Sequence, residues 1–336
     1  MGRMPLGVAI GRFARIQTSA AEMVVFATFA YLSGWAWQWL PLWMVWGILA
    51  HSSGFMHNNL RNYWWDVLSK GTDKSPLVTG DLSMRQGWAI WGVFTAAGIG
   101  LFVWLNHISG DHPMAYLFLL LYILVGMAYN ESKGWPKVVG HSLMGPSYAF
   151  AGLAVMFTGN PGTLLIPLAI WLGSFALLNN VAWGDAKDLE DEDESNVLRD
   201  LGARVRGGFL IHTRKSAGLI YGLGWLRALS LLWVGYAIYP MTPGPGTLWF
   251  LSVFALGTVS MFCFLHRMVE PQRWNRIHLV RMAGFMEPIW CTALVAILSP
   301  LLGWELSVFV IITPLVVFTL SNKFLWGSGT YWAAKV

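Results

Sequence analysis

Residues 42–66, LWMVWGILAHSSGFMHNNLRNYWWD, decide the fold. Their first part is apolar enough to belong to a membrane-spanning helix, which needs about 20 mostly apolar residues. Their second part becomes polar, and Asn58, Asn62 and Asp66 follow one another at intervals of four residues. On a helix this spacing places three oxygen-bearing side chains on one face. The stretch therefore predicts a helix that carries a polar stripe as it leaves a membrane.

The composition of the whole chain is that of a membrane protein. Of its 336 residues, 56% are hydrophobic and 12% are charged. A soluble domain has about a quarter of its residues charged, and a surface this apolar would not stay dissolved in water. The same composition excludes a disordered chain. Cys263 and Cys291 lie in separate apolar runs, so neither a CxxC motif nor a disulfide framework is expected.

Apolar runs of helical length follow one another along the chain. They occupy 20–40, 42–62, 86–106, 114–130, 138–158, 163–183, 216–238, 247–267, 279–299 and 303–322. These runs are continuously apolar and lack the alternation typical of a membrane β-barrel. We therefore expect an all-α, polytopic membrane helical bundle of about ten transmembrane helices, forming a single transmembrane domain over residues 1–336.

The basic residues indicate the orientation of these helices. If both termini lie on the same side, all but one of the 22 Lys and Arg residues fall on that side, and the opposite loops have none. Because loops rich in Lys and Arg remain cytoplasmic, both termini and the long polar loops are predicted to face the cytoplasm. Orientation in the membrane thus accounts for the net charge of +5, and no nucleic-acid partner is expected.

Arg227 is the exception, because it lies in the middle of the run 216–238. An arginine at the centre of a bilayer costs at least about 2.5 kcal/mol, so it should face the bundle interior. Glu22 and Glu287 lie inside other runs and are the candidate partners. Arg227 is therefore expected either to form a structural ion pair or to contact a substrate within the membrane.

A second oxygen-rich segment, DAKDLEDEDE (185–194), follows the run 163–183. Asp185, Asp188 and Glu192 are spaced i, i+3 and i+7, which again places them on one helical face. Most acidic runs are solvated loops. This one continues directly from a membrane helix, as the first polar stripe does, and we therefore expect the two stripes to act together.

Two facing acidic stripes would repel each other unless cations lie between them. Carboxylate and amide oxygens suit Mg²⁺, which retains several waters and often binds substrate phosphates. The predicted metal ligands are Asn58, Asn62, Asp66, Asp185, Asp188 and Glu192, with Asp66 and Asp188 as the catalytic pair. The predicted diphosphate-binding cations are Lys70, Lys74, Lys133, Lys137 and Lys187. A membrane site of this kind fits a lipid that carries a diphosphate, such as an isoprenyl diphosphate.

These segments resemble the UbiA superfamily of intramembrane prenyltransferases. NNLRNYWWD (58–66) and SPLVTG (75–80) resemble the family's NDxxDxxxD and RPLxSG motifs, and DAKDLEDE (185–192) resembles its second Asp-rich motif. AYNESKGWPK (128–137) and RWNRIHLVRMAGFMEP (273–288) resemble the family's Tyr…Lys segment and the lead-in to its last helix. The resemblance covers residues 12–300 and leaves 303–322 as an extra C-terminal transmembrane helix.

The resemblance implies a helical bundle around a central cavity that opens on the cytoplasmic side. It implies that Mg²⁺ assists the departure of diphosphate, and that a lipophilic, aromatic acceptor then attacks the allylic cation. Tyr129, together with Lys133 and Lys137, resembles the segment of the family that contacts the diphosphate. The expected partners are an isoprenyl diphosphate, the acceptor and membrane lipids.

Several positions depart from the family pattern. Asn59 and Asn62 replace aspartates of the first motif, Ser75 replaces an arginine, and Glu192 replaces the last aspartate of the second motif. Each lost carboxylate weakens the binding of a hard cation. Two alternatives to a transferase therefore remain: a terpene cyclase on the same fold, and a non-catalytic membrane subunit that binds a lipid or pigment. The sequence identifies neither the acceptor nor a protein partner.

Overall fold

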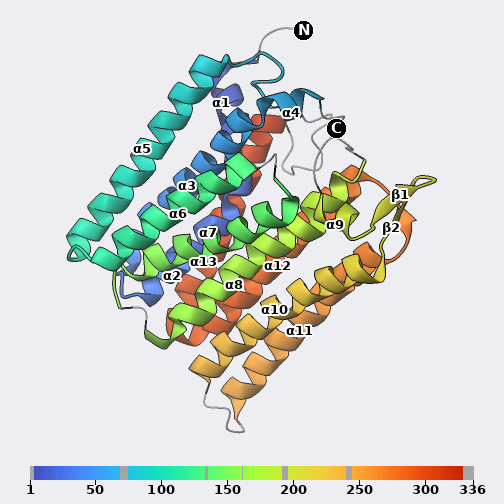
Figure 1. Ribbon diagram of the computed structural model, residues 1–336. Coiled ribbons are helices and arrows are strands. Elements are labelled where there is room, and N and C mark those ends of the chain that lie inside the picture. The colour runs from blue at the N-terminus through green and yellow to red at the C-terminus, as the bar shows by residue number, and fades with distance from the viewer. Residues whose placement is uncertain are drawn as a thin grey trace.

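The computed structural model is a bundle of long helices and describes residues 4–68, 75–132, 135–160, 162–190, 196–239 and 244–327 (Figure 1). The helices are α1 Leu6–Ala14, α2 Ala20–Leu32, α3 Leu40–Arg61, α4 Tyr63–Leu68, α5 Met84–Ser109, α6 Pro113–Glu131, α7 Lys137–Met156, α8 Leu165–Leu178, α9 Val197–Asp200, α10 Arg214–Ile238, α11 Pro245–Val269, α12 Arg276–Leu302 and α13 Trp304–Trp326. Shorter 3₁₀ turns are Ile16–Thr18, Trp37–Trp39 and Gly162–Leu164, and α8 continues as a π-helix, η5, over Asn179–Asp185.

The all-α membrane class is confirmed, but the count of about ten spans is not. Every predicted run contains a helix, yet within the described residues seven helices are long and apolar enough to cross a membrane. The predicted end of the first helix, over 20–40, was wrong. α2 has 13 residues and stops before Gly34, whose φ of +108° reverses the chain. α3 and α7 carry many polar residues, which lowers their hydropathy.

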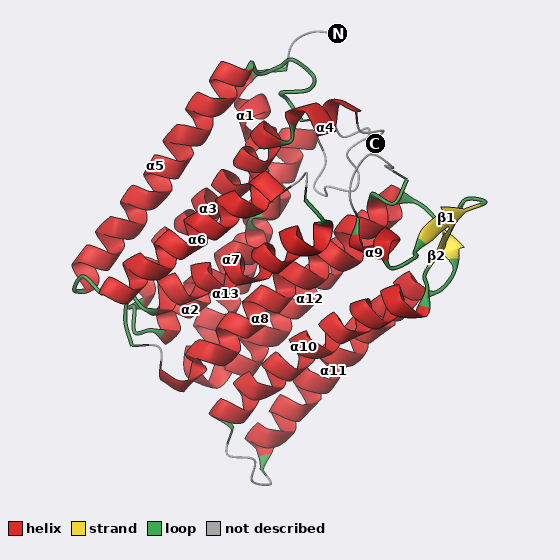
Figure 2. Ribbon diagram, viewed as in Figure 1, coloured by secondary structure: helices red, strands yellow, loops and turns green. Residues whose placement is uncertain are grey.

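A small sheet was not predicted from the sequence (Figure 2). The antiparallel strands β1 Arg204–Arg206, β2 Phe209–Ile211 and β3 Gln272–Arg273 pair in the order β1-β2-β3. Gly207 and Gly208, at φ +59° and +79°, form the two-residue turn between β1 and β2, as hairpin turns of this type require. The sheet joins the segment before α10 to the segment before α12.

Close backbone approach holds the centre of the bundle together. A Cβ atom added at Gly173 in α8 would lie 2.9 Å from the Gly145 carbonyl oxygen in α7, so only glycine fits there. Small residues at such contacts are typical of membrane helix pairs. α5 lies along one side of the bundle and the α10–α11 pair along another, leaving α2, α3, α6, α7 and α8 near the middle (Figure 1).

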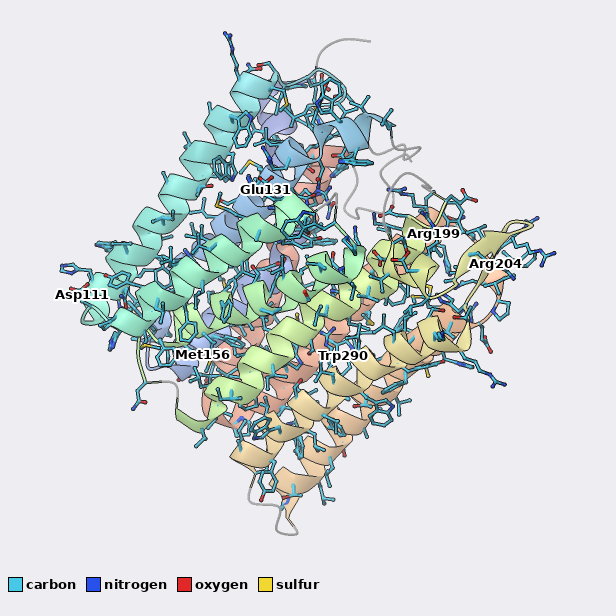
Figure 3. All side chains as sticks on the ribbon, in the orientation of Figure 1. Asp111, Glu131, Met156, Arg199, Arg204 and Trp290 are labelled. Atoms are coloured by element: carbon cyan, nitrogen blue, oxygen red, sulfur yellow. The ribbon has the colours of Figure 1, made fainter. Side chains whose placement is uncertain are left out.

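The two ends of the bundle differ in chemistry (Figure 3). Glu131, at the end of α6, and Arg199, in α9, lie towards one end, near α4 and the sheet. Asp111 and Met156 lie towards the other end, where α5 is followed by α6 and α7 finishes. We call the first of these the polar end, because both oxygen-rich segments of the sequence are found there.

Candidate functional site

A cavity of about 590 Å³ lies between α2, α3, α6, α7 and η5. Its volume is in the range of pockets that hold small molecules or cofactors. Asp66, at the end of the first polar stripe, and Asp188, in the second, both belong to its wall. The structure therefore brings together two segments that are far apart in the sequence, as the hypothesis of a shared site requires.

Most of the predicted site residues that can be placed belong to this wall. They are Asn58, Asn62, Asp66, Tyr129, Lys137, Asp185, Lys187 and Asp188. Four others lie outside the described residues: Lys70, Lys74, Lys133 and Glu192. Their predicted roles stay predictions.

The first stripe is formed where α3 ends and α4 begins. The helical hydrogen bonds continue across this boundary, from the Asn62 amide to the Asn58 carbonyl and from the Asp66 amide to the Asn62 carbonyl, each 2.9 Å. The Asn58 side chain donates to Asn130 Oδ1 at 3.0 Å, which fixes α3 against α6. Asn62 Oδ1 is buried and has no hydrogen-bond partner among the described residues. A buried oxygen without a hydrogen-bond partner can bind a cation or accept a hydrogen bond from a ligand.

Asn59, which stands where the family motif has an aspartate, has a structural role. Its side-chain nitrogen donates to the Phe13 carbonyl at 3.3 Å, and its Oδ1 accepts from Arg15 at 3.4 Å. An aspartate could not make the first of these bonds, because it has no donor when ionised. The substitution therefore attaches the N-terminal helix α1 to the bundle.

The second stripe begins in the π-helix η5, a geometry that often occurs at functional sites. Asp185 is 3% exposed, and its Oδ2 accepts from the Val197 amide at 3.0 Å. The same oxygen lies 3.0 Å from His141 Nε2 of α7. Sequence reasoning missed His141, because it lies 44 residues from Asp185 and no spacing along the chain relates them.

Asp188 is paired with cations. Its carboxylate lies 2.8 Å from Lys187 Nζ and 3.1 Å from Arg276 NH2. Burial acts to raise the pKa of this carboxyl, but the positive charges of Lys187, Arg276 and Lys137 outweigh it and hold the pKa below its usual value. Arg276 was not predicted, although it lies in the basic lead-in to α12. These three cations and Asp188 all line the cavity.

Oxygen donors of the first stripe could hold a Mg²⁺ ion. Within the described residues, no three His, Cys, Asp or Glu side chains cluster closely enough to hold a metal ion. Mg²⁺ commonly needs one or two carboxylates when phosphates and waters complete its shell. Asp66 and the unpartnered Asn62 Oδ1 meet this requirement, with Asn58 beside them. Asp185 and Asp188 are already engaged by protein donors.

Arg227 does not belong to the cavity wall formed by the described residues. Its guanidinium carbon lies 4.5 Å, 4.6 Å and 5.3 Å from the ring centres of Phe175, Trp290 and Trp171. No hydrogen bond joins it to Glu22 or Glu287 among the described residues, so the expected ion pair is not formed there, and the expected substrate contact stays a prediction. Cation–π contacts with these three rings hold the buried charge instead.

Comparison with known proteins identifies relatives of the chain. The model of the UbiA prenyltransferase family matches residues 21–286. The 4-hydroxybenzoate octaprenyltransferase of Azotobacter vinelandii is 28% identical over 233 residues, which cover 67% of this chain and 69% of that protein. The enzyme of the same description from Pseudomonas aeruginosa is 26% identical over 203 residues, which cover 56% of this chain and 58% of that protein.

Solved structures share the fold. A UbiA homolog from Archaeoglobus fulgidus bound to GPP and Mg²⁺ matches with a TM-score of 0.60 at 16% identity, covering 87% of this chain and 99% of that chain. The apo structure of a UbiA homolog from Aeropyrum pernix K1 matches with a TM-score of 0.55 at 15% identity, covering 85% of this chain and 98% of that chain. At such identities the likeness concerns the fold alone.

Proposed function

Because the chain belongs to the UbiA prenyltransferase family, we propose that it transfers an isoprenyl group from an isoprenyl diphosphate to a lipophilic acceptor, with Mg²⁺ as cofactor. The observation that carries this proposal is that Asp66 and Asp188 line the wall of the same cavity. The transferase domain is the whole membrane bundle, with α13 as an additional helix, and its polar end faces the cytoplasm.

The polar end of the cavity is suited to bind a diphosphate. Lys137, Lys187 and Arg276 provide positive charge, and Asp188 fixes the positions of the last two. Charge-assisted hydrogen bonds from such groups stabilise the negative charge of the departing diphosphate. Tyr129 lies in the same wall and is placed to contact the diphosphate.

Asn58, Asn62 and Asp66 would hold the metal ion, and Asp185 and Asp188 would face it across the cavity. When bound, Mg²⁺ supplies Lewis-acid stabilisation of the leaving diphosphate. The chain's own residues position the substrate and exclude water from the reacting carbon. The aromatic and aliphatic part of the wall includes Phe26, Trp91 and Met144, which provide an apolar surface for the isoprenyl chain.

The relatives support this assignment. The Archaeoglobus homolog was solved with a prenyl diphosphate and Mg²⁺, and the curated relatives act on 4-hydroxybenzoate. An electron-rich aromatic ring is therefore the acceptor class that we test first.

The test uses the purified full chain in lipid nanodiscs with Mg²⁺, radiolabelled geranylgeranyl diphosphate and a set of lipophilic phenols. We expect a prenylated phenol, its formation abolished by EDTA and lowered about 100-fold or more by Asp66→Asn or Asp188→Asn. Asp111→Asn is the control, because Asp111 lies at the opposite end of the bundle. It should retain the full rate.

Two results would contradict the proposal. Release of a free cyclic hydrocarbon without an acceptor would identify a terpene cyclase. Binding of the diphosphate with no EDTA-sensitive turnover under any of these conditions would identify a non-catalytic subunit.

A further inference from the structure

The inner end of the cavity is also polar, although it lies within the bundle. Glu22 of α2, His51 of α3 and Tyr148 of α7 line it. His51 precedes Asn58 on α3 by seven residues, which corresponds to about 10 Å along the helix axis. An isoprenyl chain alone needs no polar groups at this depth, so these side chains call for another explanation.

Glu22 and His51 form a buried pair. Each is 7% exposed, and His51 Nδ1 lies 2.9 Å from Glu22 Oε1. The two groups make a close ion-pair contact rather than a well-aligned hydrogen bond. Tyr148 donates its hydroxyl to the same Oε1 at 3.4 Å.

Thr18 holds the other side of the His51 ring. The Thr18 hydroxyl donates to the Arg15 carbonyl at 2.9 Å, and its Oγ1 lies 2.8 Å from His51 Nε2. The ring is therefore fixed between Thr18 and Glu22.

The other carboxylate oxygen, Glu22 Oε2, has no hydrogen-bond partner among the described residues. Burying such an oxygen unsatisfied costs about 1–3 kcal/mol, more for a charged group. Arg227 does not relieve it, because its guanidinium lies among three aromatic rings. Because Glu22 lines the cavity, a ligand that reaches this residue could supply the missing hydrogen-bond donor.

We propose that Glu22, held by His51, is the inner binding site of the acceptor substrate, and that its Oε2 accepts a hydrogen bond from an uncharged hydroxyl group of that substrate. The proposal rests on the function proposed above. The acceptor then lies between Glu22 and the diphosphate end, with its hydroxyl pointing inward. The separation of about 10 Å between these ends leaves room for an aromatic ring.

The charge of the site selects among aromatic acceptors. A carboxylate group placed at this end would face the Glu22 carboxylate in a low-dielectric interior, where like charges repel strongly. Among the arginines that line the cavity, Arg15 is nearest to Glu22 in the sequence. Its guanidinium is already in contact with Asn59 Oδ1 and the ring of Phe55. The site therefore favours a neutral phenol or hydroquinone and disfavours an aromatic acid whose carboxylate points inward.

Binding of naphthalene probes tests the site without requiring turnover. The full chain in nanodiscs is titrated with 1-naphthol, with 1-methoxynaphthalene, which lacks the donor, and with 1-naphthoate, which is anionic. We expect the wild type to bind naphthol about 10-fold or more tightly than its methyl ether, because hydrogen bonds to charged groups contribute about 1.5–3 kcal/mol. Glu22→Gln should reduce this ratio several-fold and Glu22→Met should bring it close to one. In both variants naphthoate should bind about 10-fold more tightly than in the wild type.

Glu287→Gln is the control, because Glu287 is a partly buried carboxylate of α12 that lies outside the described cavity wall and accepts from Asn179 at 2.9 Å. It should keep the naphthol preference, and gel filtration with thermal melting verifies that each variant is folded. The proposal would be overturned if the wild type did not prefer naphthol to its methyl ether, or if Glu22→Gln kept the whole of this preference. Asp66→Asn should lose prenyl transfer and keep the preference. Loss of transfer in the wild type with the preference intact would instead refute the proposed function alone.

Discussion

His141 and Asp185 share a buried hydrogen bond of 3.0 Å, although 44 residues separate them in the sequence. The bond joins α7 to the π-helix η5 and fixes the first acid of the second stripe. His141 Nδ1 is buried and has no partner among the described residues. The pair therefore fixes Asp185 in the wall of the cavity at the polar end of the bundle.

Replacing His141 tests this positioning role. His141→Leu removes one of the two hydrogen-bond partners that Asp185 Oδ2 has among the described residues and leaves only the Val197 amide, which should lower the free energy of unfolding by about 1–3 kcal/mol. His141→Gln keeps a donor and should recover most of the loss. Thermal melting in nanodiscs measures both variants, and equal melting temperatures for Leu and Gln would contradict the role.

Restoring an acid of the first stripe should strengthen metal binding. Asn62→Asp adds a carboxylate where an unpartnered Oδ1 is buried, so the Mg²⁺ concentration needed for half-maximal activity should fall several-fold. Without Mg²⁺ the buried charge should lower the melting temperature, and added Mg²⁺ should restore it.

Asn106→Asp is the matched control for that substitution. Asn106, in α5, is also buried with an unpartnered Oδ1, and it lies near the opposite end of the bundle, outside the described cavity wall. It should lower stability without any response to Mg²⁺. A similar Mg²⁺ response in both variants would show that the ion does not bind at the first stripe.

His212 should make the protein sensitive to acid. Burial lowers its pKa from 6.5 to about 4, and its Nε2 has no partner among the described residues. The folded state therefore resists protonation, whereas the unfolded state takes up a proton below pH 6.5. Above that pH the group has no effect, and as the pH falls towards 4 the protein should lose up to roughly 3 kcal/mol of stability.

The pH dependence of melting, measured for wild type and His212→Gln, tests the effect. The variant should be less sensitive to acid between pH 6.5 and 4. Parallel curves for the two proteins across this range would exclude His212 as the cause.

Arg227→Met distinguishes a structural cation from a substrate contact. The guanidinium is 0% exposed and its three nitrogens have no hydrogen-bond partner among the described residues, so an apolar chain of similar length should be tolerated with little loss of stability. We expect less than about 1.5 kcal/mol of change and an unaltered KM for the prenyl diphosphate. A large rise in KM would support the substrate contact that the sequence left open.

The sequence predicted features that depend on local pattern. Apolar runs located the helices, and the spacing of Asn58, Asn62 and Asp66 predicted a stripe that the structure places on the cavity wall. The same reasoning predicted a shared site for Asp66 and Asp188, and the structure places both in the wall of one cavity; the metal ions and the charged ligand expected between them stay a prediction.

Features that depend on tertiary contacts could not be predicted. The partners of Asp185 and Asp188, His141 and Arg276, come from helices that no spacing relates to them. The hairpin around Gly207 was overlooked because its strands are only three residues long. The predicted count of about ten spans is not confirmed: α2, with 13 residues, is not among the seven helices of the described part of the chain that are long and apolar enough to cross a membrane.

The small sheet has a mechanical consequence for the bundle. β2 precedes α10 and β3 follows α11, so their pairing clamps both ends of this helical hairpin at one point. Trp274, next to β3, also donates its indole hydrogen to the Ala186 carbonyl at 3.1 Å. The pairing therefore fixes the polar end of the α10–α11 hairpin relative to Ala186 and to the start of α12, where Arg276 contacts Asp188.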